Sequence, residues 1–144
     1  MTELDAALVR RKLSRISRDL DDLAAVEGLP LEEYRRDRFR QKGCERMLQE
    51  IVEAAVDVNL HLLRTGGAEA PTDYYRSFIA LGRRGLLSEE LAEALAPAAG
   101  LRNRLVHEYD AIDDGIVLEA VAEARALFRR YIEAVEARLA EEGF

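Results

Sequence analysis

The sequence predicts an all-α protein: an antiparallel four-helix bundle with one additional short helix, in a single domain over residues 1–144. Through most of the chain apolar residues recur every three or four positions, the period of a helix buried on one side. No segment alternates apolar and polar residues between hairpin turns, so no strand is expected. The segments between the helical stretches are short, and helices joined by short connections pack as antiparallel neighbours.

The first predicted helix has its apolar stripe between Val9 and Leu23. Thr2 and Asp5 provide a start signal, and Gly28 provides a stop.

The second predicted helix begins near Leu31, directly after Pro30, and runs until Thr65. Acidic residues in its first turn favour a helix start at this point. Its inner stripe is formed by Leu48, Ile51, Ala55, Val58 and Leu62.

Three further helical segments follow. A short helix is expected from about Asp73 to Arg84, and a fourth helix from Ser88. Pro97 lies inside this fourth helix and Gly100 follows it, so we expect a kink there and a bare backbone surface that another helix could approach closely. The last helix is expected from about Gly115 to Glu142.

Composition places the protein in the cytoplasm. The lone cysteine, Cys44, has no disulfide partner in the chain and no Cys/His cluster around it. No secretory signal is visible, and no apolar run approaches the roughly 20 residues that a membrane helix needs. We therefore expect no membrane association, no metal site and no cofactor.

The formal net charge of −7 argues against binding nucleic acid through bulk electrostatics, but the charge is unevenly distributed. Two basic clusters stand on the first two predicted helices. A solvated helix face is the simpler interpretation, and a path for an RNA backbone is the functional one. The clusters are Arg10, Arg11, Lys12, Arg15 and Arg18, and Arg35, Arg36, Arg38, Arg40, Lys42 and Arg46.

The candidate site is the stretch RNRLVHEYD, from Arg102 to Asp110, directly behind the Pro97–Gly100 break. On an ideal helix Arg102 and His107 project roughly 140° apart, whereas Asn103 and His107 share a face. A single copy therefore brings Arg102 and His107 together poorly. Two copies facing each other across a two-fold axis could build a cleft from both chains, which predicts a homodimer.

These residue types suit cleavage of a phosphodiester without a metal. An imidazole such as that of His107 exchanges a proton at neutral pH, as activation of a ribose 2′-hydroxyl requires. Arg102 offers a planar, permanently charged fork to phosphate oxygens, and Asn103 could orient the imidazole or the substrate. The alternative to a catalytic role is that His107 only caps the helix end or is a solvated side chain.

The string also resembles the R-x4-H-x-Y signature of the HepT toxins, which are all-helical ribonucleases of the HEPN superfamily. The similarity extends over about residues 5–140, including ERMLQEIVEAAVDVNLHLL, the Tyr74-Tyr75 pair and LLSEELAEALA.

The resemblance implies the toxin of a type VII toxin–antitoxin pair, a homodimeric and metal-independent endoribonuclease acting on tRNA or mRNA. Arg102 and His107 match the two catalytic residues, and Asn103 matches the polar residue after the arginine. Tyr109 matches the tyrosine that a minimal nucleotidyltransferase antitoxin of the MntA type modifies with AMP. A negatively charged nucleotide there would pair with Arg102 and repel RNA. The rival interpretation is a non-catalytic subunit that binds nucleotide or substrate for a small nucleotidyltransferase.

Asp57 and His61 are four residues apart on the second predicted helix. Asp57 could hold the His107 imidazole in one tautomer, although a local ion pair or solvent exposure is the simpler expectation. Tyr74, Tyr75 and Phe78 could stack on bases, but anchoring the short helix to the bundle is the simpler expectation.

Overall fold

The computed structural model describes residues 3–144, apart from the side chain of Tyr109. Every regular element in this part of the chain is helical, which confirms the predicted fold class. The elements are α1 (Ala6–Leu23), α2 (Leu31–Arg35), α3 (Arg38–Thr65), α4 (Tyr74–Arg83), α5 (Glu89–Leu95), α6 (Ala98–His107), the 3₁₀ turn η1 (Tyr109–Ala111) and α7 (Asp114–Glu141).

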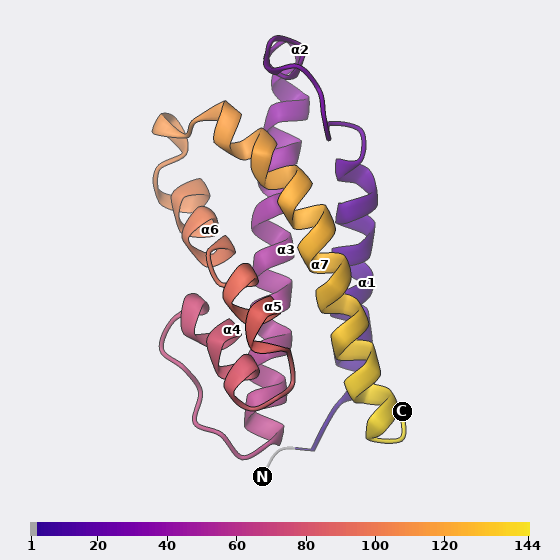
Figure 1. Ribbon diagram of the computed structural model, residues 1–144. Helices are drawn as coiled ribbons and strands as arrows, with labels where there is room; N and C mark the ends of the chain where they lie inside the picture. Colours follow the sequence, from indigo (N-terminus) through magenta and orange to yellow (C-terminus); the bar gives the residue numbers. More distant parts are fainter. Residues whose placement is uncertain (1–2) are drawn as a thin grey trace.

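The long helix α3 is the centre of the bundle (Figure 1). α1 and α7 pack together on one flank of α3, while α4 and α6 pack on it from the other side. α5 and α6 follow one another as the fourth arm of the bundle, and α4 is the additional short helix beside them. The predicted stripes on α1 and α3 lie in the core, where Val9, Ile16 and Ile51 are almost completely buried.

A buried polar network ties α4 to the centre of this bundle. The Tyr131 hydroxyl on α7 donates to Asn59 Oδ1 on α3 at 2.6 Å, and Asn59 Nδ2 donates to Ser77 Oγ on α4 at 3.1 Å. Each of these polar groups is satisfied, so the network fixes the position of α4 without the cost of an unpaired buried group. The Tyr131 ring also packs edge-to-face on Phe78 of α4, with the ring centroids 6.2 Å apart.

Local capping explains where most helices begin. The side chain of Asp5 accepts the Leu8 N–H, that of Asp73 accepts the Arg76 N–H, and that of Ser88 accepts the Leu91 N–H. These three predicted starts are confirmed, while Thr2 lies outside the described residues. α1 ends at Leu23, earlier than predicted, and hydrogen-bonded turns lead from there to Gly28, whose φ of +79° suits glycine.

The prediction of one continuous helix from Leu31 to Thr65 is wrong. The helix stops after Arg35, because Asp37 adopts an extended backbone (φ −119°, ψ 101°) and its side chain accepts the Arg40 N–H at 3.0 Å. Asp37 thus acts as the N-cap of a new helix, α3, within a run of charged residues that reads as helical throughout.

The Pro97 region is a break rather than a kink within one helix. α5 ends at Leu95 and α6 begins at Ala98, because Pro97 has no N–H for the helical ladder. Pro97 itself keeps a helical backbone (φ −59°, ψ −21°), so α6 continues in nearly the same direction as α5 (Figure 1). None of the helices within residues 3–144 is long and apolar enough to cross a membrane.

Candidate active site

The RNRLVHEYD stretch forms the second half of α6 and the turn after it. α6 is helical as far as His107, so the angular relations expected from sequence hold: Arg102 faces α3, and Asn103 and His107 face outward. The structure brings Arg102 and Asn103 together, with Arg102 Nη1 donating to Asn103 Oδ1 at 3.3 Å.

Arg102 is held by its own chain. Its Nε and Nη2 atoms donate to Glu53 Oε1 on α3, at 3.2 and 3.1 Å. Its guanidinium lies over the Tyr74 ring on α4, with Cζ 4.8 Å from the ring centroid, a cation–π arrangement. The Arg102 side chain is only 19% exposed. Tyr74 therefore anchors α4 to α6, which confirms the prediction that it has an anchoring role.

Glu53 is kept ionised for this contact. Burial alone would raise the pKa of the Glu53 carboxyl, but hydrogen bonds from Gln49 and Arg102 and the charges of Arg102 and Arg46 bring that pKa below its usual value. Gln49 Nε2 donates to the same Oε1 atom at 2.9 Å. Arg102 thus has a carboxylate partner at neutral pH.

His107 differs from Arg102 in its exposure and in its hydrogen bonding. It is the last residue of α6, its side chain is exposed, and no other described residue forms a hydrogen bond with it. Neither ring nitrogen is therefore occupied by a hydrogen bond from the described residues. Asp57 does not contact this imidazole within the chain, because its Oδ2 atom pairs with Lys12 Nζ on α1 at 2.8 Å. This ion pair joins residues 45 positions apart, so it is not the local pair that was expected.

The second histidine, His61, has a structural place. Its Nε2 atom accepts the Asp5 N–H at 2.9 Å and thereby tethers the start of α1 to the end of α3. Within the described residues, no three His, Cys, Asp or Glu side chains gather as a metal site would need.

Tyr109 begins the 3₁₀ turn that follows α6. The turn is closed by hydrogen bonds from the Glu108 N–H to the Arg104 carbonyl at 2.8 Å and from the Ala111 N–H to the Glu108 carbonyl at 3.0 Å. The backbone of Tyr109 thus lies next to the exposed end of α6, and its side chain lies outside the described part of the structure.

The outward face of α6 is open to solvent in the described part of the chain. Gly100, Asn103, Arg104 and His107 lie on one side of the helix and are all exposed. A Cβ at Gly100 would meet no atom within 4 Å, so the close approach expected at this glycine is not used inside the chain.

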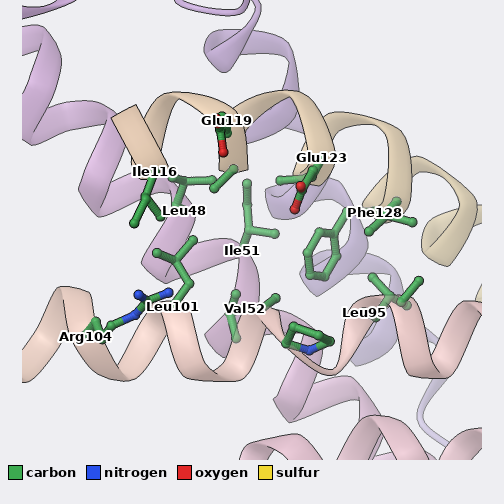
Figure 2. A pocket seen from close by; sticks show the side chains of 16 residues that line it. Leu48, Ile51, Val52, Leu95, Leu101, Arg104, Ile116, Glu119, Glu123 and Phe128 are labelled. Atoms are coloured by element: carbon green, nitrogen blue, oxygen red, sulfur yellow. The ribbon is translucent and has the colours of Figure 1, made fainter. Parts of the chain in front are cut away.

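An apolar cavity of about 190 Å³ lies between α6, α3 and α7 (Figure 2). Leu101 and Ile51 point into it from α6 and α3, and Glu119 and Glu123 stand on the α7 side with Arg104 on the α6 side. Ile116 at its rim is 42% exposed. This side of α6 offers an apolar surface with charges of both signs around it.

A larger, polar groove of about 930 Å³ lies between the first half of α3 and the segment of η1 and α7. Only the second of the two basic clusters lines this groove. The cluster on α1 is on the opposite flank, where α1 packs on α3 and α7 (Figure 1). The groove residues are Arg35, Arg38, Gln41, Lys42, Glu45, Arg46, Gln49, Leu105, Asp110, Ile112 and Asp114.

Sequence reasoning missed Glu53 and Gln49. The ion pair of Glu53 with Arg102 joins residues 49 positions apart, so no pattern of neighbouring residues in the sequence predicts it. The one available signal was a carboxylate two positions after the core residue Ile51, on a helix whose neighbours are mostly apolar.

Comparisons with known proteins identify the family of this chain. The family model described as ribonuclease HepT-like matches residues 13–135. The tRNA nuclease HepT of Aphanizomenon flos-aquae is 37% identical over 139 residues, covering 96% of this chain and 95% of that protein. The mRNA nuclease HepT of Shewanella oneidensis is 26% identical over 130 residues, covering 90% of this chain and 97% of that protein.

A solved structure shares the fold as well. The tri-AMPylated HEPN toxin of Shewanella oneidensis, in complex with its MNT antitoxin, superposes with a TM-score of 0.82 at 25% identity and covers 93% of this chain and 99% of that chain. The likeness to this structure thus extends over most of the helical bundle. The chain belongs to the HepT-like ribonuclease family.

Proposed function

We propose that this protein is the toxin of a toxin–antitoxin pair and cleaves RNA without a metal ion. The observation that carries the proposal is the arrangement on α6: an arginine held in place by Glu53 and Tyr74, followed by a free imidazole at the helix end, at the positions of the family motif. The relatives named tRNA nuclease and mRNA nuclease support RNA as the substrate class.

The proposed reaction is attack of a ribose 2′-hydroxyl on the adjacent phosphorus. His107 accepts the hydroxyl proton while O2′ forms a bond to phosphorus and the P–O5′ bond breaks. The leaving 5′-oxygen takes up a proton from the imidazolium or from water, so the products carry a 2′,3′-cyclic phosphate and a 5′-hydroxyl. Arg102 stabilises the additional negative charge of the pentavalent transition state, and Asn103 orients the substrate.

A second copy of the chain completes the site in this proposal. Arg102 and His107 of one copy point in directions roughly 140° apart, so they meet poorly over one phosphate. The exposed face of α6 that contains Gly100 and His107 is not covered by any of the described residues, and a helix of a second copy could approach it closely. An isologous dimer there would bring the α6 helices of two copies together, so that the cleft would be built from Arg102 and His107 of both chains.

Neutralisation is proposed to act through Tyr109. A nucleotidyltransferase antitoxin would transfer AMP to the Tyr109 hydroxyl, two residues after His107. The added phosphate would pair with nearby arginines and repel RNA. The tri-AMPylated state of the Shewanella toxin in its antitoxin complex supports this mode of control. Such a pair would act in the cytoplasm, where RNA is present and Cys44 stays reduced.

The test is incubation of the purified protein with total RNA in the presence of EDTA. We expect fragments that end in a 2′,3′-cyclic phosphate, with a pattern that separates tRNA from mRNA cleavage. RNA or nucleotide binding without any cleavage would instead favour the non-catalytic subunit and contradict the proposal.

A further inference from the structure

Phe39, the second residue of α3, is 93% exposed, far more than any other large apolar side chain among the described residues. The next most exposed one, Phe144, is at 53%. A phenyl ring held in water in this way contributes nothing to the core. It lies at the end of the molecule formed by α2 and the start of α3 (Figure 1).

Two exposed arginines flank this ring. Arg36 and Arg38 have no carboxylate oxygen within 4.0 Å among the residues that the structure describes. An aromatic face between uncompensated cations is the combination with which proteins bind single-stranded nucleic acid, because the ring stacks on a base while the cations contact phosphates.

The polar groove extends from this end of the molecule towards the α6 site, where Leu105 and Asp110 line it. It begins at Arg38 and continues along α3 past Lys42 and Arg46 to Gln49. Gln49 donates to Glu53, which in turn holds Arg102. At 1.5 Å of rise per residue, Arg38 and Glu53 are about 22 Å apart along α3, a length that several nucleotides of an extended strand would occupy.

The charges in the groove favour an anion at its outer end. Two of its three carboxylates already have partners within the groove, because Glu45 pairs with Lys42 at 3.6 Å and Asp114 pairs with Arg35 at 3.1 Å. Arg38 at the open end is left uncompensated, with Arg36 and Phe39 beside it.

We propose that this groove and the exposed start of α3 beside it bind the single-stranded part of the RNA substrate next to the cleaved phosphate. Phe39, at the outer end of the groove, stacks on one base, and Arg36 and Arg38 each contact a phosphate. The inference rests on the proposed function and adds to it where the RNA lies and which residues outside the α6 motif bind it. Single-stranded RNA is required because bases inside a duplex are already stacked on one another.

Binding is tested with a fluorescent single-stranded RNA in which every ribose is 2′-O-methylated, so that the attacking hydroxyl is absent and binding is measured without cleavage. We expect Phe39→Ala to weaken binding by about 5- to 150-fold without changing its salt dependence, since base stacking involves no ion release. Phe39→Trp should bind at least as well as the wild type. Phe144→Ala, which removes an exposed ring at the other end of the molecule, is the matched control.

Substitution of Arg36 and Arg38 should instead change the salt dependence of RNA binding. In the double variant Arg36→Ala/Arg38→Ala, the slope of log affinity against log salt should fall in magnitude by about 0.7 for each lost phosphate contact, or about 1.4 in all. Arg11→Ala/Arg18→Ala removes the same charge from two exposed arginines of α1 that pair with no carboxylate among residues 3–144, and it should leave the slope unchanged.

Cleavage assays then separate this inference from the proposed function. Phe39→Ala should raise KM for a long RNA while kcat stays within about twofold. If the wild type cleaves RNA but Phe39→Ala binds and cleaves like the wild type, the groove inference is overturned and the function stands. If Phe39→Ala instead loses only antitoxin binding, the ring is a protein-docking residue and the inference is equally overturned. If the wild type does not cleave but the binding differences hold, the groove stands and the function fails.

Discussion

Arg102 and His107 lie on one helix, five positions apart, yet the fold treats them in opposite ways. The guanidinium is bound by Glu53 from α3 and covered by Tyr74 from α4, whereas the imidazole stands free at the end of α6. A group that stabilises charge acts best when it is already oriented before the reaction, because no reorganisation is then required. A group that moves a proton must instead reach the substrate. In the proposed site, the fold thus orients the arginine in advance and leaves the imidazole accessible.

The largest effect on RNA cleavage is expected from substitution of His107, the exposed residue of the pair. His107→Ala should reduce RNA cleavage by about 10²- to 10⁴-fold, the usual contribution of proton transfer by a side chain. Because His107 is exposed and without a hydrogen bond in the described structure, the thermal stability and the dimer should be unchanged. Rates are measured on a defined RNA, and His61→Gln is the matched control at the other histidine. Cleavage by His107→Ala at the wild-type rate would remove the catalytic role.

Substitution of Arg102, the residue that the fold holds in place, should lower both the rate of cleavage and the thermal stability. Arg102→Ala should lower kcat by about 10²- to 10³-fold, the typical loss of one oriented donor. It should also lower Tm, because the half-buried Glu53 loses its partner. Arg102→Lys should restore little, since an ammonium cannot keep the planar contacts with both Glu53 and Tyr74. Kinetics and thermal denaturation on the same samples check this, and a fully stable Arg102→Ala would contradict the contrast with His107.

Glu53 provides a smaller and pH-dependent effect. Glu53→Gln keeps the shape of the side chain but removes the charge that holds Arg102, so kcat should fall by roughly tenfold while KM changes little. The pKa of Glu53 is lowered in the fold, so its stabilising contribution is present above its ordinary pKa of 4.5 and is lost as the pH falls through the lower value.

The stability difference between the wild type and Glu53→Gln should therefore be full at pH 7 and shrink towards zero on acidification below about pH 4. Denaturation curves between pH 3 and 8 measure it. A difference that stays constant over this range would show that Glu53 acts only through its shape.

Tyr109 should have the smallest effect on the free protein. Tyr109→Phe should cleave RNA within about twofold of the wild-type rate, because only the modified hydroxyl is lost. Co-expression with the antitoxin is the informative measurement: the variant should remain toxic while the wild type is silenced. Full neutralisation of Tyr109→Phe would eliminate this residue as the point of control.

The features that sequence predicted well are the local ones. Asp73 and Ser88 begin helices because their side chains bond to the backbone three residues later, and the divergence of Arg102 and His107 follows from helical geometry alone. Asp37 is an instructive failure, because its capping signal is equally local but is hidden in a run of arginines. The partners of Arg102 and Asp57 could not be predicted, because these ion pairs join residues 49 and 45 positions apart.

The central claim is that two copies of the chain build the catalytic site together. Its most direct test is a mixing experiment with two inactive variants, Arg102→Ala and His107→Ala. If the working pair is Arg102 of one copy and His107 of the other, mixed dimers contain one intact pair, and RNA cleavage should return to a sizeable fraction of the wild-type rate. If mixed dimers form, as shown by co-purification of two differently tagged chains, but cleave no RNA, then each copy uses its own pair and the account is contradicted.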